Sequence, residues 1–219
     1  MEDTVPFERT VHCGLEVRRR PVGDYRTNAY AVVCAATRSS ALIDPGAEPD
    51  ALVALLAGTR PAAILITHSH PDHVDALAEM RRRLGVPVSG HPGPHVEGPA
   101  LALDHVLTDG ERLALGAHAL RACFAPGHLP DQVCYQAEGW PLAIVGDTVF
   151  AGGPGQTATP GAFRTTLRTL REVVLPWPDE TVCYPGHGEP FTVGAVRPAI
   201  MRFLARDHGD FCGDAVWDG

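Results

Sequence analysis

Histidine and aspartate residues gather in one short segment of this chain. The segment from Ile64 to Leu77 reads ILITHSHPDHVDAL, and three histidines and two aspartates lie within eight of its residues. The run before them is aliphatic, as in a strand that is buried on both faces. Imidazole and carboxylate groups bind divalent metal ions, and they also carry protons. The segment therefore indicates a metal site or a proton relay, and a polar loop without chemistry is the alternative.

Three later segments place a histidine or an aspartate just after a predicted strand. They contain His128 in FAPGH, Asp147 in VGD and His187 in YPGH. The first segment adds His68, His70, Asp72 and His73. If these strand ends lie together, their side chains line one cleft. The cleft then holds more candidate ligands than one tetrahedral metal ion can use. The set suits two ions roughly 3.5–4 Å apart that share a carboxylate and a water molecule.

The spacing inside the first segment also favours two ions. His68 and His70 are two residues apart, so their side chains can point the same way in an extended turn. Asp72 and His73 are adjacent, and adjacent side chains diverge. A hydroxide shared by two ions is a strong nucleophile at neutral pH, so the pattern predicts hydrolysis of a carbonyl or phosphoryl ester. Imidazole suits zinc, and also iron and manganese.

Apolar periodicity and turn residues predict the elements that carry these groups. The predicted strands cover residues 11–18, 28–35, 40–43, 62–66, 86–89, 112–115, 117–124, 132–136, 142–145 and 181–184. The predicted helices cover residues 48–57, 72–84, 163–174 and 196–207. Meandering strands with interspersed helices predict two sheets between helices in a single α/β domain over residues 1–219, with an irregular tail at about 208–219.

The motif THSHPDH at residues 67–73 resembles the H-x-H-x-D-H motif of the metallo-β-lactamase fold hydrolases. The later elements match in order, with His128 in PGH, Asp147 in GDTVF and His187 in PGHG. The resemblance runs from about residue 28 to residue 189 and implies a four-layer αββα sandwich with the metals at one edge of the sheets.

The resemblance also implies how the ligands divide between the ions. The first ion would be held by His68, His70 and His128, and the second by Asp72, His73 and His187. Asp147 would bridge the two ions. Asp72 would in addition orient the shared water and accept its proton as a general base.

Within that superfamily the chain resembles the glyoxalase II group of thioester hydrolases, on GDTVFAGG around Asp147 and PGHGEP around His187. It departs from the group at Asp75, where glycine is common, and at Gln156, where arginine often stands. The leading hypothesis is a dinuclear hydrolase, with zinc as the expected metal, acting on a thioester or another activated acyl compound. The alternatives are a mononuclear iron persulfide dioxygenase, using His70, His128 and Asp147, and a lactonase.

Composition and charge restrict the partners. The 219-residue chain has a net charge of -8, which disfavours nucleic acid. All its basic residues are arginine, so a lysine Schiff base is excluded. No apolar run is long enough to span a bilayer, and the acidic, polar start does not resemble a signal peptide. We expect a cytoplasmic enzyme with a small-molecule substrate. The sequence leaves open whether it forms a homo-oligomer. The roles of Asp75, His91 and His95 also stay open, and a surface loop is the favoured interpretation of the two histidines.

Overall fold

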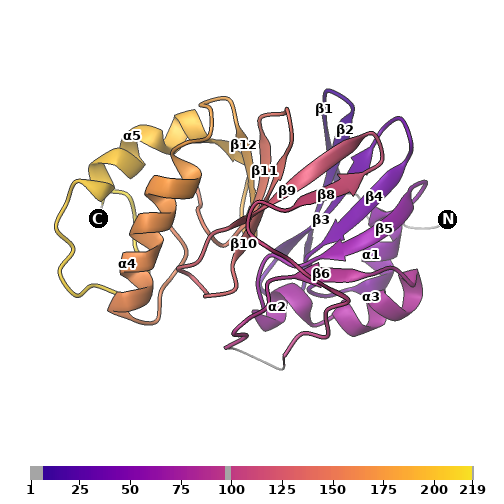
Figure 1. Ribbon diagram of the computed structural model, residues 1–219, viewed down its shortest axis with the longest axis horizontal. Helices are drawn as coiled ribbons and strands as arrows, with labels where there is room; N and C mark the ends of the chain where they lie inside the picture. Colours follow the sequence, from indigo (N-terminus) through magenta and orange to yellow (C-terminus); the bar gives the residue numbers. More distant parts are fainter. Residues whose placement is uncertain (1–6, 97–99, 219) are drawn as a thin grey trace.

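Two β-sheets pack face to face in a computed structural model that describes residues 7–96 and 100–218 (Figure 1). The seven-stranded sheet holds, in spatial order, β1 (Glu8–His12), β2 (Leu15–Val22), β3 (Thr27–Cys34), β4 (Ser39–Ile43), β5 (Arg60–Leu65), β6 (Val88–Gly90) and β7 (His105–Val106). The six-stranded sheet holds β13 (Phe191–Thr192), β12 (Val182–Pro185), β11 (Leu142–Gly146), β10 (Val133–Ala137), β9 (His118–Phe124) and β8 (Arg112–Leu115). Pairing is antiparallel from β1 to β4 and parallel from β4 to β7.

Helices cover the outer face of each sheet. The seven-stranded sheet carries α1 (Pro49–Leu55), α2 (Pro71–Val74) and α3 (Leu77–Leu84). The other sheet carries α4 (Pro160–Thr169), the π-helical turn η1 (Leu170–Val174) and α5 (Val193–Leu204). Figure 1 shows the two helical layers on opposite sides of the sheets. This arrangement confirms the predicted αββα sandwich.

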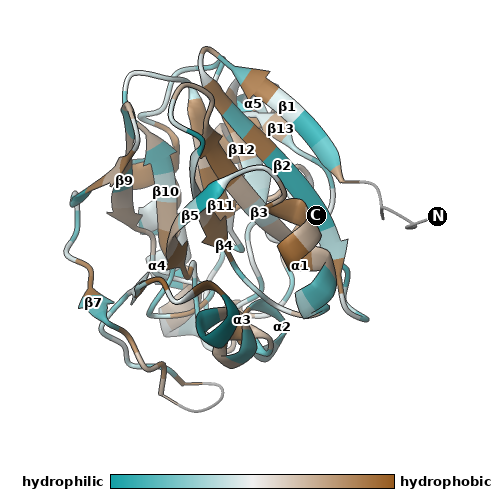
Figure 2. Ribbon diagram, turned by 90° about the vertical axis from the view of Figure 1, so that its right-hand side faces the viewer, coloured by the Kyte–Doolittle hydropathy of each residue, from teal (hydrophilic) through white to brown (hydrophobic). Residues whose placement is uncertain are grey.

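Three buried clusters hold the layers together. The cluster between the sheets includes Tyr30, Tyr135 and Tyr184. Leu52 lies in the cluster under α1 and α3, and Phe163 lies in the cluster under α4 and α5. Figure 2 shows that the central strands are largely apolar, while the visible surface of α3 is hydrophilic. The strand that precedes the histidine segment is buried on both faces only at its carboxyl end, where Leu65 lies between the sheets and Ile64 lies under the helices, which accounts for the aliphatic residues there.

The prediction of one strand over residues 11–18 is wrong, because the chain turns at Cys13 and Gly14 and forms β1 and β2. Both turn residues have a positive φ, 43° at Cys13 and 95° at Gly14, and glycine adopts such a conformation without steric cost. The short strands β7 and β13 were not predicted from the sequence.

The prediction of one helix over residues 72–84 is also wrong. The amide of Ala76 donates to the carbonyl of Pro45 at 3.0 Å instead of to Asp72, its helical partner. Gly46 packs against the Asp72 carbonyl so closely that a Cβ there would lie 1.8 Å from the oxygen. The loop after β4 therefore interrupts the helix and separates α2 from α3.

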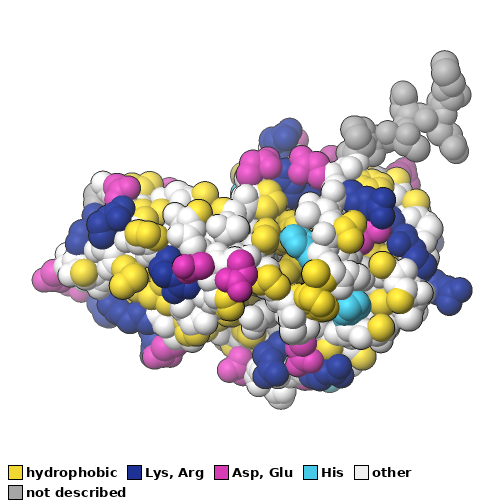
Figure 3. All heavy atoms as spheres, turned by 90° about the horizontal axis from the view of Figure 1, so that it is seen from above, with side chains coloured by type: hydrophobic (Ala, Val, Ile, Leu, Met, Phe, Trp, Pro, Cys, Tyr) yellow, Lys and Arg dark blue, Asp and Glu magenta, His cyan; other side chains and the backbone are white. Residues whose placement is uncertain are grey.

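The carboxyl ends of β5, β9, β11 and β12 deliver the predicted site residues, as expected from the sequence. Residues 208–218 form turns and contain one isolated bridge, at Gly213. Within the described part of the chain, no helix is long and apolar enough to cross a membrane. On the face shown in Figure 3, acidic and arginine side chains are interspersed.

Candidate metal centre

The structure brings all seven predicted residues together in two adjoining groups of metal-competent side chains. The first group contains His68, His70, His128 and Asp147, and the second contains Asp72, His73 and His187. Within each group the donor atoms lie within 4.8 Å of one another. Residues from four separate strand ends therefore meet in one centre.

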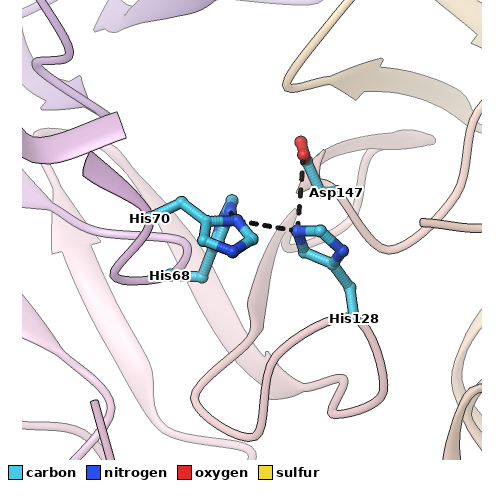
Figure 4. Close-up of side chains that lie close together, drawn as sticks. All are labelled: His68, His70, His128 and Asp147. Carbon is cyan, nitrogen blue, oxygen red and sulfur yellow. Dashed lines mark hydrogen bonds and ion pairs between the residues drawn. The ribbon is translucent and has the colours of Figure 1, made fainter. Parts of the chain in front are cut away.

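In the first group, three imidazole nitrogens converge (Figure 4). The Nδ1 atom of His70 lies 3.0 Å from Nε2 of His68 and 2.9 Å from Nε2 of His128. Asp147 Oδ2 is 3.6 Å from Nε2 of His128. Bonds of 2.0–2.1 Å to a tetrahedral ion place the donor atoms about 3.3 Å apart, so this group needs little movement to hold one.

In the second group, Asp72 Oδ2 lies 3.6 Å from Nε2 of His73 and 3.4 Å from Nε2 of His187. The carboxylate of Asp147 also reaches this group. Its Oδ1 atom lies 3.6 Å from Nε2 of His73, and its Oδ2 atom lies 3.5 Å from Nε2 of His187. Asp147 thus lies between the two groups, where a bridging ligand would lie.

Four of the five imidazoles use Nδ1 for a contact away from the centre. These contacts join His68 to Thr67 Oγ1 (3.0 Å), His73 to Asp44 Oδ2 (2.9 Å), His128 to the Gln156 carbonyl (2.7 Å) and His187 to the Tyr25 carbonyl (3.2 Å). The carbonyl and carboxylate partners can only accept, so Nδ1 donates to them. In the neutral ring this leaves the lone pair on Nε2, directed at the centre, as in histidine ligands of metals.

Asp44 supports the centre and was not recognised in the sequence. Its Oδ1 atom accepts the Thr67 amide at 2.8 Å, and its Oδ2 atom accepts the Thr67 hydroxyl at 2.6 Å. Because that hydroxyl gives its proton to Asp44, it accepts the Nδ1–H of His68. Asp44 therefore orients His73 directly and His68 through Thr67. The available signal was an aspartate at the end of an apolar strand.

Two buried atoms at the centre have no hydrogen-bond partner. They are Nε2 of His73 and Oδ1 of Asp147, which lie 3.6 Å apart. Leaving a buried polar atom unpaired costs about 1–3 kcal/mol. A divalent ion would satisfy both atoms, so the donor set fits metal ions that accept nitrogen and oxygen ligands.

Burial and charge shift the pKa values of these groups in different directions. Burial holds the pKa of His68 well below its usual value and lowers that of His128. At His73 burial also acts to lower the pKa, but Asp147 and Asp44 raise it to about 9. Burial acts to raise the pKa of Asp147, yet the neighbouring imidazoles hold it well below its ordinary range. In the metal-free centre Asp147 is ionised, and His73 carries a proton at neutral pH.

The residues with open roles lie outside both groups. His95 Nε2 donates to the carbonyl of His91 at 3.1 Å, and the ring of His91 packs on Phe124. Asp75 is exposed and follows α2. His91 and His95 thus contact each other and Phe124, and the interpretation of their segment as a surface loop stays a prediction.

Comparison with known proteins agrees with this geometry. The family description "Metallo-beta-lactamase superfamily" matches residues 22–187, which include every residue of the centre. The chain belongs to the metallo-β-lactamase superfamily. The resemblance that was based on THSHPDH and the later motifs is confirmed, and the chain is a metallo-hydrolase of that superfamily.

Two curated relatives are similar over most of this chain. A probable metallo-hydrolase of Bacillus subtilis is 33% identical over 190 residues, which cover 78% of this chain and 89% of the relative. A probable hydroxyacylglutathione hydrolase of Schizosaccharomyces pombe is 30% identical over 172 residues, covering 76% of this chain but only 65% of the relative. The second alignment therefore leaves about a third of that hydrolase unmatched.

Two solved structures share the fold. A B3 metallo-β-lactamase superposes with a TM-score of 0.74 and 28% identity, covering 83% of this chain and 96% of that one. A protein solved in a di-iron-bound form superposes with a TM-score of 0.68 and 33% identity, covering 81% of this chain and 95% of that one.

Gly186 should be essential for metal binding. A Cβ at this position would lie 2.0 Å from Asp147 Oδ1 and 2.7 Å from Cε1 of His73, so Gly186→Ala should displace both side chains. We expect metal content, measured by elemental analysis, to fall below half of the wild-type value. Gly152→Ala is the matched control, because a Cβ there has open space and should leave metal content unchanged. Full metal content in Gly186→Ala would contradict the geometry.

Metal loading should release protons. His73, with a pKa of about 9 in the metal-free centre, must lose its proton to bind an ion. The apparent affinity should therefore rise with pH up to about 9, by about tenfold per pH unit for one proton. Calorimetric titration at pH 7 in two buffers of different ionisation enthalpy measures the release. Equal heats of metal binding in both buffers would show that no proton is released and would contradict this prediction.

Proposed function

We propose that this metallo-hydrolase cleaves a thioester or another activated acyl compound and uses two divalent ions, with zinc as the expected metal. The observation that carries the proposal is the carboxylate of Asp147, which lies between two groups that are each able to hold an ion. Ions bound there would polarise the substrate carbonyl and lower the pKa of water toward neutrality.

Asp72 is the general base in this proposal. Its Oδ2 atom accepts a 2.6 Å hydrogen bond from Thr27 Oγ1 and lies 3.4 Å from Nε2 of His187. Its side chain keeps 22% of its surface exposed, whereas that of Asp147 keeps 8%. Asp72 therefore reaches the open side of the centre, where it can orient the attacking water and accept its proton.

One aromatic ring lies close to His187, and a second aromatic residue contacts it through its backbone carbonyl. The side chain of Tyr25, whose carbonyl accepts from His187, is 76% exposed. The ring of Phe150 lies 6.4 Å from the ring of His187. The ring of Phe150 is therefore the proposed contact for an acyl or thiol group whose carbonyl lies at the centre.

Support for a thioester comes from the GDTVF and PGHG segments and from the hydroxyacylglutathione hydrolase relative. Glutathione is not assigned as the carrier. The arginines of the C-terminal region bind groups of this chain: Arg197 contacts Asp179, Arg202 contacts Asp218 and Arg206 contacts the Trp217 carbonyl. Within the described part of the chain, these three arginines already have acidic or carbonyl partners, which argues against them as the site for a glutathione carboxylate.

The iron persulfide dioxygenase is the second candidate. His70, His128 and Asp147 lie in one group and could hold a single iron, and one matched structure contains two irons. The complete second group favours the hydrolase, because one iron would leave Asp72 and His187 unused. A lactonase would use the same centre for another acyl compound.

The proposal is tested on protein reconstituted separately with zinc, iron or manganese. We expect about two ions per chain and hydrolysis of some member of an acyl-thioester panel that chelation abolishes. A lactone and a β-lactam complete the panel, and oxygen uptake with a persulfide is measured in parallel. Less than one ion per chain without metal-dependent hydrolysis would refute the proposal, whereas iron-dependent oxygen uptake would favour the dioxygenase.

Asp72→Asn tests the general base. The amide keeps the size of the side chain but cannot accept the proton, so the turnover rate should fall by about 10²–10⁴-fold. Rates are compared at measured, equal metal content, since the change also affects a ligand. Asp75→Asn is the control three residues away, where the side chain is exposed and lies outside the centre. Wild-type turnover in metal-loaded Asp72→Asn would exclude the base role.

A further inference from the structure

The hairpin of β2 and β3 contacts two ligands of the second group. At the start of β3, Thr27 Oγ1 donates to Asp72 Oδ2 at 2.6 Å. In the turn before it, the carbonyl of Tyr25 accepts Nδ1–H of His187 at 3.2 Å. One hairpin thus orients ligands that come from the two different sheets.

The same hairpin also holds the segment that carries His187. The side-chain amide of Asn28 donates to the carbonyls of Pro185 at 3.0 Å and Gly188 at 2.8 Å, and its backbone amide donates to Gly186 at 2.7 Å. The hydroxyl of Tyr30 donates to the Pro185 carbonyl at 2.6 Å. The carbonyls of Pro185, Gly186 and Gly188 thus all accept hydrogen bonds from β3.

A further contact comes from β2. Arg19 donates to the Gly188 carbonyl at 2.5 Å and to Glu189 Oε2 at 2.6 Å. The guanidinium is nearly buried, with 4% of its side-chain surface exposed. Because a buried charge needs partners, this contact fixes the far end of the segment that follows His187.

The hairpin itself is well fixed. Thr27 is fully buried and Asn28 is 1% exposed. At the turn, the amide of Arg26 donates to Gly23 at 3.1 Å, and the amide of Gly23 donates to Glu48 Oε1 at 3.0 Å. The turn is therefore tied to the start of α1, so it can impose positions on the side chains that it contacts.

Ligands of the first group have other supports. His68 is oriented by Thr67, and His128 is oriented by the carbonyl of Gln156. Loss of a hairpin contact should therefore disturb Asp72 or His187 and leave these two ligands in place.

We propose that the β2–β3 hairpin is a positioning element for the second ion, in which Thr27 sets the carboxylate of Asp72 and Asn28 sets the backbone around His187. The inference rests on the proposed two-ion centre. Thr27 and Asn28 are positioning residues that act through ligands, and they determine the affinity of the second ion separately from that of the first.

The test is a zinc titration of the metal-free protein against a chromophoric chelator, together with cobalt absorption spectra. In Thr27→Val, which keeps the side-chain size and removes the hydroxyl, the second ion should bind about 10- to 100-fold more weakly and the first as in wild type. Thr27→Ser restores the hydroxyl and should restore the affinity. Asn28→Ala should weaken the second ion through His187.

Thr181→Val is the matched control, because Thr181 is also fully buried and its hydroxyl has no partner. Thr181→Val should bind both ions as wild type does. Its thermal unfolding temperature shows what a buried threonine-to-valine change does to stability alone, for comparison with Thr27→Val. Wild-type affinity for the second ion in both Thr27→Val and Asn28→Ala would overturn the inference. Equal weakening of both ions would overturn it as well, because it would show a general structural effect.

The outcomes separate this inference from the proposed function. If wild type binds two ions but hydrolyses no acyl compound, the proposed reaction fails, while selective weakening in Thr27→Val still supports the hairpin's role. If wild type binds a single ion, the two-ion part of the proposed function fails, and the hairpin inference fails with it. If wild type binds two ions and hydrolyses a thioester while Thr27→Val is unchanged, only the hairpin inference fails.

Discussion

The buried carboxylate of Asp147 constrains the whole centre. It is 6% exposed and lies within 3.6 Å of imidazole nitrogens of His73, His128 and His187. A buried carboxylate is unfavourable unless it is paired, so the structure must gather opposite charge around it. Neighbouring backbone must also come close, which requires residues without a side chain. Gly186 meets that requirement at the carboxylate, since a Cβ there would lie 2.0 Å from Asp147 Oδ1. Gly155 meets it at the backbone of the same residue, where a Cβ would lie 2.0 Å from the Asp147 carbonyl oxygen.

Hydrogen bonds join the two sheets of the sandwich directly beneath the centre, and they hold its residues in position around Asp147. The Tyr135 hydroxyl donates to the Ile66 carbonyl at 2.6 Å, and the amide of Val133 donates to Thr67 at 2.7 Å. These contacts tie β10 of one sheet to the chain that leaves β5 of the other. The ligands of the histidine segment are thereby held in register with Asp147, which follows β11 and belongs to the opposite sheet.

The residues of the centre differ in their support and exposure, and this difference does not follow the two groups, because the enclosed His73 belongs to the second one. His68 and His73 are fully enclosed and are oriented through Asp44, whereas Asp72 and His187 remain partly exposed and contact the β2–β3 hairpin. Enclosed ligands favour a stable structural arrangement, while partly exposed ones allow substrate to approach. In the proposed reaction the substrate would therefore approach from the side of Asp72 and His187.

The sequence by itself determined the seven residues of the centre and the strands that end beside them. That information is local: a strand's apolar run and the polar residues just after it are adjacent in the chain, and the motif order identifies the superfamily. Only the tertiary structure revealed the supporting residues Asp44, Thr27 and Asn28, whose partners lie 23 to 160 positions away. The break between α2 and α3 was hidden for the same reason, because Pro45 supplies the competing acceptor for Ala76. Hydrogen bonds between distant segments form only when the sheets pack, and no local pattern records them.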